Sequence, residues 1–174
     1  ISKLDSGKMK LVLQESDVVR HLQMLVNEYL SLAEARRIRY VVDVPENEHI
    51  AWYDREKVEK VCTNLLSNAF KFTPEFGIIT CRVKLLKEHR GARGSDNLRI
   101  IVADTGPGIP MAEREKIFER FYRAESDLFE DAGGTGIGLS LTRELISLMH
   151  GEVVLKSLEG AGAVFIVTLP LGKD

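Results

Sequence analysis

Apolar residues at helical spacing predict three main helices along the chain. The first begins at Asp17, whose side chain can cap it, and its apolar face continues to Ala33. The second covers residues 55–72 and ends before Pro74, because the residue before a proline avoids the helical conformation. The third starts in a glycine run at residues 134–138. Its apolar face carries Ile137, Leu141, Leu145 and Leu148.

Runs rich in β-branched residues predict strands between these helices. They cover residues 11–13, 39–44, 50–53, 78–86, 98–103, 152–157 and 163–169. Residues 87–97, with two glycines and alternating charges, are expected to form a mobile hairpin connection, and a short helix is expected near residues 111–117. Hairpins mixed with helices favour an antiparallel or mixed sheet layered with helices over a doubly wound parallel sheet.

Length and composition are those of one globular domain. The 174 residues are 44% hydrophobic and 29% charged, and no run approaches the ~20 apolar residues that a membrane span requires. A net charge of -2, with Lys and Arg scattered among carboxylates, gives no basic footprint for nucleic acid. Cys62 and Cys81 lack zinc-ligand spacing and are expected to be reduced thiols in the core, as in a reducing compartment.

One flank of the second helix carries polar residues in a row. Asn64, Asn68 and Lys71 fall at i, i+4 and i+7, on a flank roughly 110° from the core stripe. That stripe consists of Val58, Val61, Cys62, Leu65 and Ala69. A solvated flank is one interpretation. A metal–phosphate site is the other, because Mg²⁺ keeps several waters and accepts one or two protein oxygens, and asparagine is a poor helix former.

Asp104 follows the apolar run at residues 100–103 and opens the segment Asp-Thr-Gly-Pro-Gly-Ile. A carboxylate at a strand end can accept a hydrogen bond from an exocyclic amine, and Gly106 and Gly108 allow a flat ring to approach the backbone. A turn aspartate is the alternative. Aspartic proteases also contain Asp-Thr-Gly, but they need two such aspartates sharing a proton, and this chain has one copy followed by prolines.

The glycine run leaves backbone N–H groups accessible at the start of the third helix. Bare amides at a helix N-terminus are a natural site for phosphate, although glycine clusters also form ordinary loops. The run is not a dinucleotide fingerprint, since GxGxG differs from GxGxxG and the preceding strand and following acidic residue are absent. Arg123, which opens the acidic stretch before the glycines, could reach a terminal phosphate.

Four segments in order resemble the nucleotide-binding boxes of sensor histidine kinases. Residues 64–73 (NLLSNAFKFT) resemble the N box and residues 104–109 (DTGPGI) the G1 box. Residues 117–123 (IFERFYR) resemble the F box and residues 134–139 (GTGIGL) the G2 box. Four motifs in this order are highly specific, and the resemblance covers nearly the whole chain. A last glycine motif at residues 160–163 (GAGA) has alanine where serine or threonine is common.

The resemblance implies a Bergerat-type fold, which gyrase, Hsp90 and MutL ATPases share. This fold is a two-layer α/β (α+β) sandwich with a mixed, largely antiparallel sheet covered by helices on one face. By the same resemblance Asp104 binds the adenine amino group, Asn68 holds Mg²⁺, and residues 124–136 form the ATP lid. The catalytic residues would be Asn64, Lys71 and Arg123, of which Asn64 and Lys71 also contact phosphates. The other ATP-contacting residues would be Gly106, Gly108, Ile109, Phe118, Tyr122, Gly134, Thr135, Gly136, Ile137, Gly138 and Leu139.

The function that the resemblance implies is that of the ATP-binding catalytic domain of a two-component sensor histidine kinase. Such a domain transfers the γ-phosphoryl group of ATP to a histidine on a separate phosphoacceptor and dimerisation domain, and a response-regulator receiver domain is the next partner. Residues 1–10 are expected to be the end of an upstream helix and a linker, and residues 11–174 the catalytic domain. The implied location is cytoplasmic, and anchoring of the parent protein in the inner membrane stays open.

Other classes of the same superfamily are the alternatives. An ATP-hydrolysing switch or an anti-sigma-type serine kinase carries a glutamate base four residues before the metal-binding asparagine. Here that position is Asn64, whose carboxamide cannot accept a proton as a base must. A non-catalytic scaffold is a third class, and a phosphotransfer assay separates it from a kinase.

Overall fold

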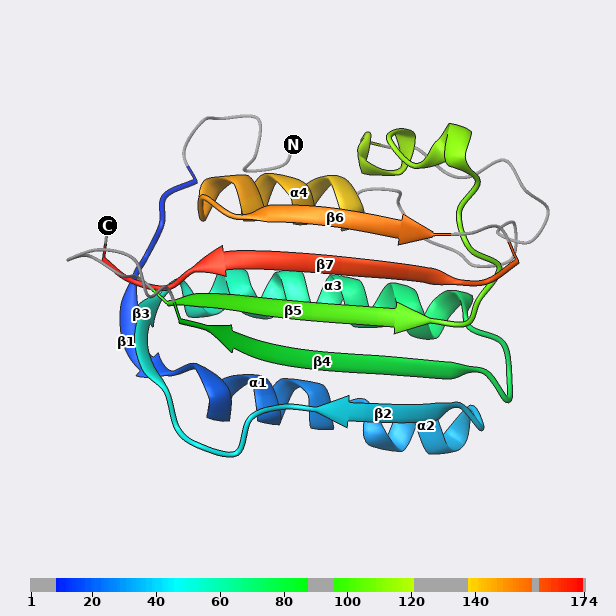
Figure 1. Cartoon of the computed structure of the whole chain (residues 1–174), viewed down its shortest axis with the longest axis horizontal. Helices are drawn as coiled ribbons and strands as arrows, with labels where there is room; N and C mark the ends of the chain where they lie inside the picture. The colour runs from blue at the N-terminus through cyan, green and yellow to red at the C-terminus, as the bar shows by residue number, and fades with distance from the viewer. Residues whose placement is uncertain (1–8, 88–95, 121–137, 158–159, 174) are drawn as a thin grey trace.

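A five-stranded mixed sheet forms one layer of the protein (Figure 1). The computed structural model describes residues 9–87, 96–120, 138–157 and 160–173. The strand order is β2-β4-β5-β7-β6, with β2 parallel to β4 and the other neighbours antiparallel. The strands are β2 (Arg39–Asp43), β4 (Ile78–Leu86), β5 (Asn97–Asp104), β6 (Glu152–Ser157) and β7 (Ala163–Pro170). A separate antiparallel pair joins β1 (Gln14–Asp17) and β3 (Ile50–Tyr53).

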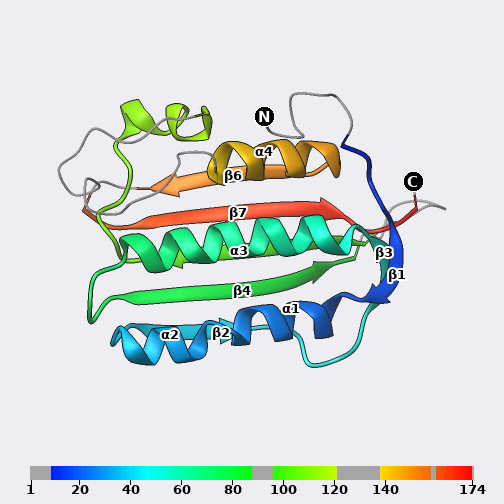
Figure 2. The ribbon, with the colours of Figure 1, turned by 180° about the vertical axis from the view of Figure 1, so that it is seen from behind.

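Helices form the second layer and cover one face of the sheet. They are α1 (Val18–Asn27), α2 (Leu30–Ala35), α3 (Arg55–Phe72) and α4 (Gly138–Leu148). Figure 2 shows them in front of the sheet, and Figure 1 shows the opposite face without any of them over it. β7 is accordingly buried at every second residue, as expected where one face of a sheet meets the core. The predicted fold class is therefore confirmed.

The central helix α3 has the bounds that the sequence predicts. Its N-cap is Asp54, and its C-cap is Thr73, in extended conformation before a proline. The predicted core stripe is buried along its whole length. Cys62 on α3 and Cys81 on β4 are free, buried thiols, and burial raises the pKa of both, that of Cys81 to about 12. Within the described ranges, no helix is long and apolar enough to cross a membrane.

The predicted first strand is wrong in position. It lies at Gln14–Asp17 instead of residues 11–13, because β3 pairs only with that stretch. The backbone N–H of Val12 instead donates to the side chain of Asp54. The segment ahead of β1 is thus held by a side chain instead of a strand ladder.

The helix predicted from Asp17 begins correctly but is divided into α1 and α2. The Asp17 carboxylate caps α1 by accepting from the N–H groups of Val19 and Arg20. At the division the Tyr29 N–H bonds to the carbonyl of Val26, three residues back, which tightens the turn.

The helix predicted near residues 111–117 consists of two 3₁₀ turns, η2 (Met111–Glu113) and η3 (Lys116–Phe118). Their backbone bonds run over three residues, from Glu113 to Pro110 and from Glu119 to Lys116. The connection predicted at residues 87–97 lies mostly outside the described residues, although β4 and β5 pair as the expected hairpin.

Candidate nucleotide-binding site

The polar flank of α3 lies at the edge of the buried core, as its spacing predicts. Asn64, Asn68 and Lys71 are each partly exposed. The side-chain amide of Asn64 donates to the carbonyl oxygen of Gly138 at 3.3 Å and to Thr142 Oγ1 at 3.2 Å. The middle of α3 is therefore joined to the first turn of α4.

Asn64 also borders a surface hollow of about 410 Å³ over the first turns of α3. The other lining residues are Gln14, Arg55, Glu56, Glu59, Lys60 and Thr63. Further along the same flank, the Lys71 ammonium lies 5.3 Å from the centre of the Phe72 ring. Carboxamide and ammonium groups thus line this flank from Asn64 to Lys71.

Asp104 stands at the end of β5, beside the C-terminal end of α3. Its Oδ1 accepts a hydrogen bond from the Gly106 N–H at 2.8 Å. A Cβ on Gly106 would lie 3.0 Å from the carbonyl oxygen of Phe72, so this glycine permits close packing of the loop on α3. Gly108 has a φ of 73°, in the left-handed region that favours glycine. These contacts place the carboxylate and the glycines of the predicted G1 box together.

Two opposing effects act on the pKa of the Asp104 carboxyl group. Burial raises its pKa above the ordinary value, and hydrogen bonds from the backbone N–H groups of Gly106 and Ala163 oppose the rise. A partly buried carboxylate with few donors is ready to accept another hydrogen bond from a ligand amine. Perturbed pKa values of this kind cluster at functional sites, and burial of the charged form costs stability in the free protein.

The end of β6 and the turn before β7 contact the Asp104 loop and hold it in place. The Ile109 N–H donates to Ser157 Oγ at 2.7 Å, and this hydroxyl donates to the carbonyl of Gly162 at 2.9 Å. Gly162 has a φ of +86°, and a Cβ there would lie 1.9 Å from the carbonyl oxygen of Asp104. Sequence reasoning missed Ser157, although a serine at the end of an apolar strand was a usable signal.

The F-box segment packs against α4 and the sheet. The Phe118 ring meets the Phe165 ring edge to face, with centroids 6.3 Å apart, and the Arg143 guanidinium lies 5.3 Å from the Phe118 centroid. Arg120 forms an ion pair with Glu144 at 3.2 Å. Phe118 therefore packs between β7 and α4, and its contact with ATP stays a prediction.

Within the described residues α4 covers Gly138–Leu148, which agrees with a helix that starts in the glycine run, and Leu139 packs against the core. Among the described residues, no atom lies within 4 Å of where a Cβ on Gly138 would stand, so the packing of these residues does not demand glycine there. Tyr122, Arg123 and the glycine run at residues 134–137 lie outside the described residues, as does the predicted lid at residues 124–136. Of the predicted ATP-contacting residues, the structure thus brings together those on α3, on the Asp104 loop and at the start of α4.

The sheet is largely antiparallel and is covered by helices on one face. Helix α3 contacts the Asp104 loop at its C-terminal end and the start of α4 near its middle. This arrangement is that of a Bergerat-type nucleotide-binding domain. Residues 53–173 match the family described as histidine kinase-, DNA gyrase B-, and HSP90-like ATPase. The match covers most of the chain, and the protein therefore belongs to this family.

Comparison with individual proteins narrows the class. The chain is 35% identical over 171 residues to hybrid signal transduction histidine kinase D of Dictyostelium discoideum, covering 98% of this chain and 11% of that protein. The solved catalytic domain of histidine kinase ThkA matches with a TM-score of 0.73 at 25% identity, covering 93% of this chain and 99% of that one. Full-length ShkA in complex with AMPPNP matches with a TM-score of 0.75 at 25% identity, covering 99% of this chain and 34% of that one.

These matches confirm the family resemblance and the predicted class, an ATP-binding catalytic domain of the histidine kinase type. The chain spans only 11% of the length of the Dictyostelium relative. What the domain does within a longer protein is therefore a separate question.

Proposed function

We propose that this chain is the catalytic domain of a two-component sensor histidine kinase, which binds ATP along α3 and offers the γ-phosphoryl group to a histidine on a separate phosphoacceptor and dimerisation domain. The observation that supports this most is the position of α3. Phe72 at its end contacts the Asp104 loop, and Asn64 near its middle bonds to the start of α4. Eight residues of helix separate these contacts, or roughly 12 Å at 1.5 Å per residue.

In this proposal the polar groups divide into those that bind adenine and those that contact the phosphates. Asp104 accepts a hydrogen bond from the adenine amino group, and the backbone at Gly106 and Gly108 passes along the ring. Asn64 and Lys71 contact the phosphates, and the first turn of α4 provides N–H groups to them. Arg123 and the glycine run keep the roles predicted from the sequence, as does Tyr122.

The residues present fit a magnesium ion held mainly through ATP. The described part of the chain contains no cluster of three His, Cys, Asp or Glu side chains that could cage a metal. Asn68 offers one carboxamide oxygen on the partly exposed flank. Mg²⁺ commonly takes one or two protein oxygens, several waters and substrate phosphates. When bound, it would supply neutralisation of the phosphate charge.

In this proposal the domain acts mainly by positioning the γ-phosphoryl group for transfer to the acceptor histidine. Phosphoryl transfer needs an aligned acceptor and stabilised charge, and effective molarity gained by alignment can lower a barrier by ~7–11 kcal/mol. Asn64 stands where an ATP-hydrolysing relative would carry a base, and its amide nitrogen is already used to hold α4. A two-component kinase would then pass the phosphoryl group to a receiver domain of a response regulator.

A phosphotransfer assay tests this function. The isolated chain should bind ATP but release phosphate far more slowly than ~1 per second, a typical enzymatic rate. Adding the phosphoacceptor domain, in cis or in trans, should produce an acid-labile, alkali-stable phosphohistidine on that domain. Rapid phosphate release by the isolated chain would favour the hydrolytic switch, and normal ATP binding without transfer would favour the scaffold.

A further inference from the structure

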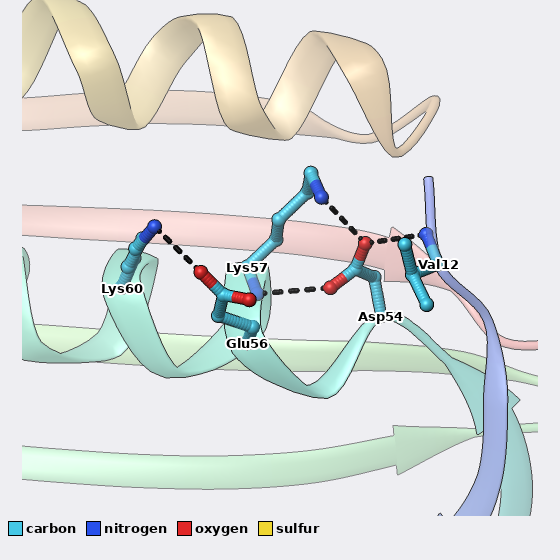
Figure 3. Close-up of polar contacts among 5 residues, drawn as sticks. All are labelled: Val12, Asp54, Glu56, Lys57 and Lys60. Atoms are coloured by element: carbon cyan, nitrogen blue, oxygen red, sulfur yellow. Dashed lines mark hydrogen bonds and ion pairs between the residues drawn. The ribbon is translucent and has the colours of Figure 1, made fainter. Parts of the chain in front are cut away.

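The N-terminus of α3 holds a buried carboxylate that binds two parts of the chain at once (Figure 3). Asp54 is 2% exposed. Its Oδ1 accepts from the backbone N–H of Lys57 at 3.1 Å, which caps the helix. Its Oδ2 accepts from Lys57 Nζ at 2.7 Å and from the backbone N–H of Val12 at 2.8 Å. Oδ1 thus caps α3, and Oδ2 binds both the Lys57 ammonium and the segment ahead of β1.

The charge on Asp54 makes this second oxygen a strong acceptor. Burial acts to raise the pKa of Asp54, but the hydrogen bonds from Lys57 and from the backbone of Val12 lower it below its ordinary value. Hydrogen bonds to an ionised acceptor are about twice as strong as neutral ones. A buried ion pair is seldom more stabilising than well-packed apolar residues, so net stability alone gives no reason for this arrangement.

Val12 is held by its backbone and not by its side chain. The side chain is 67% exposed, while the N–H points to Asp54. Met9 and Leu11, just before it, pack against the core, and Gln14, just after it, begins the pairing with β3. The bond to Asp54 therefore fixes the chain at the point where it passes the end of α3, as Figure 3 shows.

We propose that Asp54 is a positioning residue for phosphotransfer, because it fixes the incoming chain to the helix that carries Asn64 and Asn68. The inference rests on the proposed function, in which the phosphoacceptor domain precedes residue 11. α3 is a single helix of 18 residues. The bond to Val12 holds the incoming chain at the first turn of α3. It therefore sets how the acceptor domain, which precedes Val12, is oriented toward Asn64 and Asn68 further along α3.

The substitution Asp54→Asn separates the helix cap from the other two hydrogen bonds of this carboxyl group. An asparagine can keep its carbonyl oxygen on the Lys57 N–H and so preserve the cap. Its NH₂ group then faces two donors, Val12 N–H and Lys57 Nζ, and both bonds are lost. Asp43→Asn is the matched control, because it makes the same change of carboxylate to carboxamide and breaks the exposed ion pair between Asp43 on β2 and Arg82 on β4, 2.8 Å long.

The experiment compares transfer in cis with transfer in trans. In the kinase that contains both domains, Asp54→Asn should lower the rate of autophosphorylation by on the order of tenfold to hundredfold, since a misplacement of about 1 Å can cost that much. With the acceptor domain supplied as a separate protein, the variant should match the wild type. Its ATP affinity should also stay within about twofold, because the nucleotide contacts lie further along α3. Hydrogen exchange should show a faster-exchanging Val12 amide, and Asp43→Asn should change none of these values.

The possible results distinguish a failure of the proposed function from a failure of the role proposed for Asp54. A wild-type kinase that fails to phosphorylate the acceptor would overturn the proposed function itself. Equal losses in cis and in trans would show that Asp54 is only structural, and a normal rate in cis with an exposed Val12 amide would show that the bond does not orient the domains. Val12→Pro, which deletes the donor and leaves Asp54 intact, gives an independent test should Asp54→Asn fold poorly. It should reproduce the loss that is specific to transfer in cis.

Discussion

The side-chain amide of Asn64 donates to the carbonyl oxygen of Gly138 at 3.3 Å, although 74 residues separate them. Thr142 Oγ1 accepts from the same amide at 3.2 Å and donates to the same carbonyl at 2.8 Å. Thr142 is completely buried, with 0% exposure. Polar groups that satisfy one another at the edge of the core fix a unique arrangement, here that of α4 and the polar flank of α3 that carries Asn64, Asn68 and Lys71.

Thr142→Val tests whether this arrangement serves ATP binding. Valine has a similar shape but neither donates nor accepts, so the Asn64 amide loses a partner in a buried place. The free energy of unfolding should fall by ~1–3 kcal/mol, as measured by urea denaturation. ATP affinity, measured by calorimetry, should fall as well, because the start of α4 is no longer held beside Asn64. Thr142→Ser, which keeps the hydroxyl, should bind ATP as the wild type does. Loss of stability with unchanged affinity would make the contact purely structural.

The bounds of α3 and most strands were predictable because their signals are local. Asp54, the apolar stripe and the proline after Thr73 determine where α3 begins, what it buries and where it ends. The close contact of Gly162 with the backbone of Asp104 was not predictable, because it depends on how β7 lies beside β5. Thr142 was missed for the same reason. A polar residue in an apolar face shows its partner only when the second helix is in place.

Asp104→Asn should separate stability from adenine recognition. The folded-state pKa of Asp104 lies above its ordinary value because of burial, so ionisation costs stability. That contribution is favourable at low pH and is lost as pH rises through the folded pKa. Asparagine removes the cost and can still accept from the Gly106 N–H, so the variant without ligand should melt no lower than the wild type at pH 7 and should lose this part of the pH dependence.

The same variant should lose most of its stabilisation by ATP. For the wild type at a hundredfold excess of ATP over Kd, linkage gives ~2.7 kcal/mol, or roughly 5–10 °C in melting temperature for a chain of this size. Asparagine replaces one carboxylate acceptor with a nitrogen donor and weakens the bond to the adenine amino group. Thermal melts with ATP and with adenosine provide the measurement. A full thermal shift in the variant would exclude Asp104 as the adenine acceptor.

Substitutions on the flank of α3 should distinguish metal from phosphate contacts. If Asn68 supplies an oxygen to Mg²⁺, Asn68→Ala should remove the magnesium-dependent part of the ATP affinity. Lys71→Ala should weaken ATP more than adenosine, because it removes a cation from the phosphates. Titration calorimetry with Mg²⁺ and with EDTA measures both effects. Equal losses for ATP and adenosine in both variants would mean that the flank has only a structural role.

Gly138→Ala should raise stability while it weakens ATP binding. A Cβ at Gly138 would meet no atom of the described part of the chain within 4 Å. Replacing glycine in a compatible conformation stabilises a protein by ~0.4–1 kcal/mol, because it reduces the entropy of the unfolded chain. The added methyl group would stand where the phosphates approach the bare N–H groups of α4. Thermal melts should therefore show a small rise in melting temperature without ligand, and calorimetry should show a loss of ATP affinity of about tenfold, or ~1.4 kcal/mol.

Gly151→Ala is the opposite control, since its Cβ would lie 2.5 Å from the carbonyl oxygen of Thr168. It should destabilise the protein and leave ATP affinity intact. Unchanged ATP affinity in Gly138→Ala would show that this glycine is not needed for phosphate approach.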